Sequence, residues 1–520
     1  MLAMQLHLAD LRSPGRWTYR NGRWEYGGSW IATPPVAVLR VFVKHEPTAT
    51  TLLVRELLTT SSTPPEDSLD QQERTTWPGD YLRIHLTANK AELEAGLYGT
   101  APVYLTATDT ALYGSWWLPD LRHRLSADDL CDRAVARLLT RQQPYTTETL
   151  FTQVWQLTER ARATFTTDGL TMTYPEPATH VLRARDIAAG VDVTAAFEAL
   201  LADSTATRRT RNPVGVELSG GCDSANVALS VREVHDGPLC SAGVIVDDTA
   251  MGRDQQRRRA SIAALCGLVD EQINGSAYAP FTPGGIRGRG EPHDVGEFYR
   301  EAFAAVGSHF AQCGVRVVFT GVGGDELAAL RPNEATLPPA RAECIPWLGP
   351  RSRETVVEDD GGAAPVTVLP RSVLTGSAVH NPDYLAAGMW PVAPLATPAL
   401  VRFSQQLPVH LRRGKRFLRQ RLHRAGLPQS VVHPRRPENF LGLMQKGLRC
   451  HGLPLARRLL QTGMLLADTG HIDPAVFAAT VDDASTRRHL PTMLCDTLMA
   501  ELSLRSLLGC PASMSSREFS

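Results

Sequence analysis

The sequence predicts an α/β protein whose two parts differ in character. Up to about residue 190, β-branched and aromatic runs separated by turns indicate a mostly β region with few helices. From residue 214, short apolar runs alternate with helical stretches, which is typical of a parallel sheet covered by helices. With 520 residues the chain is too long for one ordinary domain, so two or three are expected.

Local patterns predict the elements of the first part. VAVLRVFV at 36–43 is a strand-like run, and APVYLTATDTALYGSWWL at 101–118 alternates as a hairpin does, with Asp109 and Thr110 at its turn. Apolar residues at helical spacing predict a helix in DDLCDRAVARLLTRQ, 128–142, and another near 186–211 that leads into the second part.

The second part contains three apolar runs that predict neighbouring parallel strands: VGVEL at 214–218, CSAGVIV at 240–246 and VRVVFT at 315–320. Residues 331–370 are rich in proline, glycine and charge and predict a long loop. The chain after 385 is predicted to be helical, with amphipathic helices in VRFSQQL, 401–407, and RFLRQRLHRAGL, 416–427.

Composition narrows the classes of protein. The 54 basic residues balance 54 acidic ones, which favours no nucleic-acid or membrane partner. Nine scattered cysteines, no N-terminal signal pattern and no unbroken apolar run of membrane-spanning length indicate a cytoplasmic protein with reduced thiols. The 15 histidines show no metal-ligand spacing, and Arg257, Arg258 and Arg259 are expected on a solvated helix face.

The turn Ser219–Ser224 (SGGCDS) follows the first predicted strand and precedes a predicted helix. Free backbone N–H groups and the positive end of the helix dipole make such a turn suitable for an anion, and glycines allow close approach of a phosphate. Asp223 would repel a phosphate, which indicates that it holds a metal ion instead. The alternative is that the serines and Asp223 only cap the helix.

A second turn, in VRVVFTGVGGDELAAL at 315–330, strengthens the first interpretation. It again joins an apolar strand to a helix, and Asp325 and Glu326 open that helix. Parallel strands end at the same sheet edge, so both turns are expected to lie together there. Paired glycine turns with carboxylates predict a site for a nucleoside triphosphate and Mg²⁺, without the lysine of a P-loop motif.

The combination S-G-G-x-D-S and G-x-G-G-D-E resembles the asparagine synthetase B family, in the synthetase domain with its pyrophosphate loop. LPVHLRRGKRFLRQRL at 407–422 is similar to the family's L-P and K-x-x-L-R segment, placing Lys415 and Arg419 on it, and HPRRPENFLGL at 433–443 to R-x-K-x-x-F. YGTAPVYL and TTETLF resemble parts of the glutaminase domain. The similarity covers roughly residues 95–510.

The resemblance implies two domains. Residues 1–190 would be a remnant of an Ntn-hydrolase-like, αββα-type glutaminase domain, and residues 191–520 an ATP-pyrophosphatase-type synthetase domain with a parallel sheet. It also implies ATP and Mg²⁺ as ligands, with Asp223 and Asp325 as metal ligands. The residues expected to bind the nucleotide are Leu218, Ser219, Gly220, Gly221, Asp223, Ser224, Val246, Thr320, Gly321, Gly323 and Gly324. The basic residues expected to support catalysis are Lys415, Arg435, Arg436 and Lys446.

Several positions depart from the family pattern. Residue 2 is Leu where a glutaminase of this type has its cysteine nucleophile, and Ala95-Gly96 replaces an Arg-Asp pair. Glutamine hydrolysis is therefore not expected. In this respect the chain resembles lasso peptide cyclases and β-lactam synthetases, the branch of the family without glutaminase activity. Val322 stands where asparagine synthetases have Glu and β-lactam synthetases a catalytic Tyr, and Pro437 replaces the usual Lys. These two changes bear on attack by the amine rather than on adenylation.

The resemblance implies an AMP-forming amide synthetase, which adenylates a carboxylate and joins it to an amine. Macrolactam formation of the lasso-cyclase kind, with a precursor peptide and its leader-processing enzymes as partners, is the expected variant. An intermolecular amide ligase and a β-lactam-type synthetase acting on a small metabolite remain alternatives. A non-catalytic ATP-binding scaffold is the alternative from another class.

Overall fold

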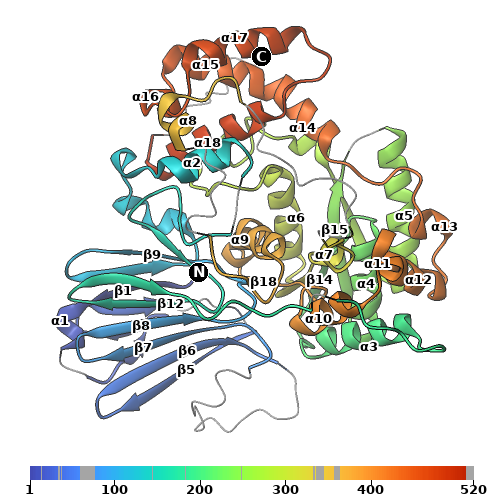
Figure 1. Ribbon diagram of the computed structural model, residues 1–520, viewed down its shortest axis with the longest axis horizontal. Coiled ribbons are helices and arrows are strands. Elements are labelled where there is room, and N and C mark those ends of the chain that lie inside the picture. The colour runs from blue at the N-terminus through green and yellow to red at the C-terminus, as the bar shows by residue number, and fades with distance from the viewer. Residues whose placement is uncertain are drawn as a thin grey trace.

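Three β-sheets organise the protein in the computed structural model (Figure 1). The structure describes residues 1–12, 15–32, 36, 38–58, 77–142, 145–181, 183–246, 249–331, 334, 345–355 and 363–510. Two antiparallel sheets of seven and six strands come from the first part of the chain, and a parallel sheet of five strands comes from the second. The predicted α/β class is therefore confirmed.

The first antiparallel sheet contains the predicted hairpin. Its strands in spatial order are β11 (Trp155–Leu157), β9 (Val103–Ala107), β10 (Ala111–Ser115), β1 (Ala3–His7), β4 (Ser29–Ala32), β3 (Arg23–Tyr26) and β2 (Thr18–Arg20). Leu112 of β10 pairs with Ala107 of β9, so the turn contains Asp109 and Thr110 as predicted.

The second antiparallel sheet faces the first across a shared core. Its strands in spatial order are β13 (Gly169–Thr173), β12 (Arg162–Thr166), β8 (Lys90–Ala95), β7 (Tyr81–Thr87), β6 (Ala49–Glu56) and β5 (Leu39–Glu46). Leu6 and Ile31 of the first sheet lie in the same buried cluster as Leu52 and Ile84 of the second. Alternating side chains thus point between the two sheets, as in packed β layers.

Helices are few around these two sheets. Within the described part of residues 1–190, the α-helices are α1 (Leu8–Leu11) and α2 (Asp132–Leu139). The helix predicted over 128–142 is confirmed by α2. Two helices of four and eight residues do not form two outer layers, so the four-layer αββα arrangement is not confirmed.

The parallel sheet has the order β16 (Leu268–Asn274), β15 (Leu239–Ile245), β14 (Val214–Glu217), β17 (Val317–Phe319) and β18 (Trp390–Val392). The three predicted runs form its central strands, whereas the edge strands β16 and β18 were not predicted. Val317 and Phe319 pack into the cluster that contains α4 (Cys222–Val234), while Val318 packs against α6 (Arg300–Gln312) on the other face. Helices therefore cover both faces.

The remaining helices extend the second part. The principal ones are α3 (Val193–Ala206), α5 (Ala250–Cys266), α9 (Arg371–Ala386), α10 (Pro398–Gln406), α12 (Arg416–Arg424), α14 (Leu441–Gly447), α15 (Leu453–Thr462), α17 (Pro474–Thr486) and α18 (Met493–Leu507). The helices predicted near 186–211, at 401–407 and at 416–427 correspond to α3, α10 and α12. The predicted loop 331–370 contains the short helix α8 (Pro350–Thr355), and much of that segment lies outside the described residues.

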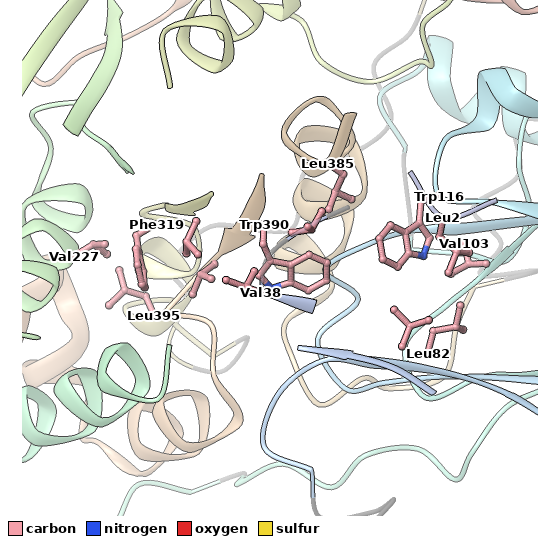
Figure 2. Close-up of a cluster of buried hydrophobic side chains, with 14 of the residues drawn as sticks. Leu2, Val38, Leu82, Val103, Trp116, Val227, Phe319, Leu385, Trp390 and Leu395 are labelled. Carbon is pink, nitrogen blue, oxygen red and sulfur yellow. The ribbon is translucent and has the colours of Figure 1, made fainter. Parts of the chain in front are cut away.

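The hydrophobic core is continuous between the antiparallel sheets and the parallel sheet. The ring centroids of Trp116, which follows β10, and Trp390 of β18 are 6.1 Å apart (Figure 2). A buried ion pair between Glu56 and Arg208, with an Nε to Oε1 distance of 2.8 Å, also joins the two parts. None of the helices in the described ranges has the length and apolar character that crossing a membrane requires.

Candidate functional site

The first glycine turn links β14 to α4 without the capping that a purely structural turn uses. Gly220 has a φ of +87°, a left-handed conformation that glycine adopts without strain. Gly221 occupies the N-cap position of α4, and no side chain caps the helix there. The first turn of this 13-residue helix therefore presents its N–H groups to a ligand.

The two serines shape the turn from inside. The Ser219 backbone N–H donates to Ser224 Oγ at 3.3 Å, and the two hydroxyl oxygens are 3.1 Å apart. The Gly221 N–H donates to Ser219 Oγ at 3.1 Å. These hydrogen bonds fix the conformation of the turn that precedes the N-terminus of α4.

The second turn lies directly against the first. A Cβ atom on Gly321 would lie 3.1 Å from the Ser224 backbone nitrogen, and one on Gly324 would lie 2.2 Å from Asp223 Cγ. Gly323 has a φ of +97°, and the Thr320 N–H is held by the Val392 carbonyl of β18 at 2.9 Å. The glycines are thus required for the close approach of the two turns, as their shared sheet edge predicted.

A lysine ammonium bridges the aspartates of the two turns. Lys415 Nζ lies 2.5 Å from Asp223 Oδ2 and 2.7 Å from Asp325 Oδ1. Lys415 itself has a φ of +59°, an uncommon conformation for a non-glycine residue that is typical of functional sites. Arg419 supports its segment by donating to the Gly414 carbonyl at 2.8 Å.

The charges of this cluster do not balance. Burial raises the pKa of Asp223, and the charges of Asp325 and Glu326 add to that effect against the opposing Lys415 ammonium. Burial alone would lower the pKa of Lys415, but the Asp223 and Asp325 carboxylates outweigh it and raise that pKa. Two carboxylates thus contact one ammonium, and the Glu326 charge acts on Asp223 from further away, so negative charge exceeds positive charge in this cluster.

The residues fit a divalent cation. Asp223 Oδ1 is buried and has no hydrogen-bond partner among the described residues, so one of its oxygens is available as a ligand. Carboxylate oxygens are the ligands that Mg²⁺ prefers, and the Lys415 ammonium marks the position between two of them where positive charge is stabilised.

A carboxylate also occupies the anion-binding side of the turn. A Cβ atom on Gly221 would lie 2.5 Å from Glu438 Oε1, which is 3.4 Å from Ser219 Oγ. Arg258 Nη2 donates to Glu438 Oε2 at 2.6 Å, and its Nε donates to the Gly220 carbonyl at 3.0 Å. Glu438 therefore stands at the helix N-terminus in the position where an anionic ligand would lie.

Helix α5 contributes two buried polar residues that the sequence analysis missed. Arg258 is 2% exposed, and Gln255 is fully buried. The Gln255 amide donates to the Ser219 carbonyl at 2.8 Å and accepts from the Val246 N–H at 3.1 Å, so it joins the turn to the end of β15. Leu218 is fully buried, and its N–H donates to the Ala242 carbonyl, which places it in the sheet beside the turn.

The expectation of a solvated arginine face at 257–259 is wrong for two of the three residues. Arg257 is exposed, but Arg258 holds the turn, and the fully buried Arg259 pairs with Asp270 at 2.7 Å. Successive side chains leave the helix about 100° apart, so Arg257 points to solvent while Arg258 and Arg259 point into the protein.

The predicted basic residues do not all converge. Lys415 lies in the site, whereas the Arg436 side chain pairs with Asp254 at 3.4 Å and only its carbonyl is held by Arg258. Arg435 is exposed between Pro434 and Arg436. Lys446 is exposed on α14, where its charge adds to the effect of burial in lowering the pKa of His451.

Two apolar positions flank the turns. Val322 packs into a cluster with Leu369 and Val373, so no proton-exchanging group occupies its position. Cys222 is buried, and burial raises the pKa of its thiol to about 12. It therefore fills space rather than reacting.

A buried charge network lies just before the first turn. His380 of α9 lies 3.1 Å from Glu217 Oε2 and 3.3 Å from Glu297 Oε2, and the Tyr384 hydroxyl donates to the same Glu217 oxygen. Burial alone would lower the pKa of His380, but the two carboxylates outweigh it and raise that pKa well above its usual value. The imidazolium thus anchors the last residue of β14 to α9.

Replacing His380 by glutamine is expected to lower the free energy of unfolding most at pH 6, with a deficit that shrinks toward pH 9. A group whose pKa is raised on folding stabilises fully below its unfolded value of about 6.5 and loses that contribution as pH rises through the folded value. Urea unfolding at several pH values measures this. His423→Gln, at an exposed position on α12, is the control, and a deficit that does not change with pH would contradict the prediction.

Some solved structures resemble this chain only weakly. No curated protein matches the sequence. Among solved structures, the allosteric regulatory enzyme of purine biosynthesis matches at 10% identity with a TM-score of 0.17, covering 49% of this chain and 68% of that one. Glutamine phosphoribosylpyrophosphate amidotransferase from B. subtilis matches at 9% identity with a TM-score of 0.17, covering 57% and 68%. Such low TM-scores carry no structural argument.

A protein-family model gives the informative match. The asparagine synthase family model covers residues 196–359, a range that contains both glycine turns, Gln255 and Arg258. Lys415 and Glu438 lie beyond the matched range and join the site only through the fold. Over these residues the chain is similar to the asparagine synthase family.

Proposed function

We propose that this protein is an ATP-dependent, AMP-forming amide synthetase that adenylates a substrate carboxylate and then joins it to an amine. The observation that carries the proposal is the Lys415 ammonium bridging Asp223 and Asp325 at the N-terminus of α4, where Asp223 Oδ1 is still free to bind a cation. The family match over both turns supports the same chemistry.

The residues of the site have distinct tasks in this reaction. The N–H groups at the start of α4 bind the pyrophosphate portion of ATP, and Asp223 and Asp325 hold Mg²⁺. When bound, Mg²⁺ neutralises charge that develops on the leaving pyrophosphate. Lys415 adds a fixed positive charge beside the metal ligands, and Arg258 and Gln255 keep the turn in its binding conformation.

The amine is proposed to come from a substrate rather than from glutamine. At the position of the family's Arg-Asp pair, a Cβ atom on Gly96 would lie 2.3 Å from Asp80 Oδ1. The Asp80 carboxylate accepts hydrogen bonds from the backbone of Tyr98 and Thr100, so it supports the local turn. Val322 supplies no base, which favours an amine that reacts without the Tyr dyad of β-lactam formation. Cyclisation of a peptide through an Asp or Glu side chain is therefore the proposed variant.

Pyrophosphate release from Mg-ATP tests the proposal. The purified protein is supplied with candidate carboxylates, including peptides that contain internal Asp or Glu, and Asp325→Ala is the control variant. Release that depends on one carboxylate and is lost in the variant is the expected result, after which mass spectrometry identifies the amide product. Absence of both release and ATP binding by calorimetry would contradict the proposal.

Replacing Glu438 by glutamine is expected to tighten ATP binding about fivefold. The substitution removes a negative charge from the anion position, and two unit charges about 4 Å apart in water repel by about 1 kcal/mol. Calorimetry with Mg-ATP measures the change, and Glu291→Gln, an exposed carboxylate outside the turns, is the control. Weaker ATP binding by Glu438→Gln would show instead that this carboxylate is needed to hold Arg258.

A further inference from the structure

Three potential metal ligands meet at the amino edge of the parallel sheet, away from the glycine turns. Cys240 is the second residue of β15, His309 lies in the last turn of α6, and Cys313 caps that helix. Cys240 Sγ is 3.2 Å from Cys313 Sγ and 3.3 Å from His309 Nε2, and Cys313 Sγ is 3.4 Å from the same nitrogen. Their ligand atoms all lie within 4.8 Å of one another.

The fold brings these residues together for reasons that are separate from their chemistry. His309 and Cys313 are four residues apart, so they share one face of α6. That helix packs on β15 through Phe310 and Val306 against Ala242 and Val244. The apolar contact therefore fixes the distance between the two α6 ligands and the strand.

The distances are somewhat shorter than those of a tetrahedral zinc site but are compatible with one. Bond lengths of about 2.3 Å to sulfur and 2.1 Å to nitrogen place two sulfurs about 3.8 Å apart and sulfur and nitrogen about 3.6 Å apart. The observed distances are shorter than these by at most about 0.6 Å, which small side-chain rotations can supply. A sulfur separation of 3.2 Å is well beyond a disulfide bond, and both cysteines are free.

The ligand cluster is accessible to a metal ion from solvent. Cys313 is exposed, whereas Cys240 and His309 are half-buried, so an ion can enter from the solvent side. Burial raises the pKa of the Cys240 thiol to about 12, with a further increase from the adjacent Cys313. Such a thiol is a poor nucleophile, so the cluster does not fit a site for a reactive thiol.

We propose that Cys240, His309 and Cys313 bind one Zn²⁺ ion through two thiolates and one imidazole, with the fourth position open to a water molecule. The ion ties the end of α6 to the start of β15. Four strand residues, about 13 Å, separate the level of Cys240, which pairs with Gly215, from the turn that begins at Ser219. The zinc site is thus distinct from the Mg²⁺ site, and its role is to stabilise the sheet.

Zinc titration of the reduced, chelator-treated full-length protein tests the proposal. A competing metal indicator should report one bound Zn²⁺ per chain, and Zn²⁺ should raise Tm. Cys240→Ser, His309→Gln and Cys313→Ser should each weaken binding about a hundredfold or more and abolish the Tm shift. Cys450→Ser, at another exposed cysteine, should bind Zn²⁺ as the wild type does.

Cobalt substitution gives a second readout that does not depend on stability. Co²⁺ in the wild-type protein should show a thiolate charge-transfer band, and Cys313→Ser, at the exposed end of α6, should reduce that band to about half because one of two thiolates is lost. Reduced wild-type protein that takes up no Zn²⁺ would overturn the proposal. Equal Zn²⁺ affinity and an unchanged cobalt band in Cys313→Ser would also overturn it.

Discussion

Asp223→Asn is expected to lower carboxylate-dependent pyrophosphate release about 10²- to 10³-fold at saturating Mg-ATP. Asparagine keeps the shape of the side chain but removes the charge of the oxygen that is buried without a partner and available to Mg²⁺. Loss of one charged ligand forfeits several kcal/mol of stabilisation of the leaving pyrophosphate. The measurement is a continuous pyrophosphate assay, run at several Mg²⁺ concentrations.

The same substitution should leave the protein folded. Because burial raises the pKa of Asp223, its ionised form is a cost to the folded state at neutral pH, and a neutral asparagine removes that cost. Tm should therefore stay the same or rise while activity falls. Asp236→Asn, at an exposed carboxylate just beyond the same helix, is the matched control. Activity within twofold of wild type in Asp223→Asn would refute a metal role for this residue.

The convergence of Asp223 and Asp325 was predictable from sequence because it follows from a general property of parallel sheets. Two apolar strands that each end in a glycine turn must present those turns at one edge. The structure places the turns so close that Gly324 has no room for a Cβ atom beside Asp223. Strand patterns and glycines therefore carried enough information to find this part of the site.

The buried polar residues around the turn were not predicted, because their partners come from distant segments. Arg257, Arg258 and Arg259 look alike in sequence, yet Gln255, Arg258 and Arg259 share one helix face at spacings of three and four residues and point into the protein. That spacing, rather than the amount of charge, was the usable signal.

Side chains on irregular segments were the hardest to predict. Arg435 and Arg436 follow the short helix α13 (Gln429–Val432), where no periodic pattern defines their direction, and Glu438 rather than either arginine reaches the turn. Cys240 and His309 are 69 residues apart, so their contact depends on how α6 crosses β15. The four-residue spacing of His309 and Cys313 was visible in the sequence, but the expectation that no histidine has metal-ligand spacing overlooked this pair.

Lys415→Met is expected to reduce carboxylate-dependent pyrophosphate release about a hundredfold, whereas Lys446→Met should change it less than twofold. The Lys415 ammonium lies between the Asp223 and Asp325 carboxylates, and the Lys415 backbone is left-handed. A methionine at this position keeps much of the side-chain length but carries no charge. Loss of one preorganised positive group near the leaving pyrophosphate costs about 10²-fold in rate. Lys446 is exposed on α14 beside His451 and makes no ion pair with the described residues.

Comparing Lys415→Met with Lys446→Met shows which of these two lysines supports catalysis, out of four lysines in the chain. Lys415→Arg should recover part of the lost rate, because it restores charge, but not all of it, because a planar guanidinium cannot take the place of a compact ammonium between two carboxylates. Initial rates across a range of Mg-ATP concentrations separate an effect on binding from one on the chemical step. If Lys446→Met loses more pyrophosphate-release activity than Lys415→Met, the catalytic positive charge comes from α14 rather than from η6 (Arg413–Lys415). That result would contradict the placement of Lys415 in the site.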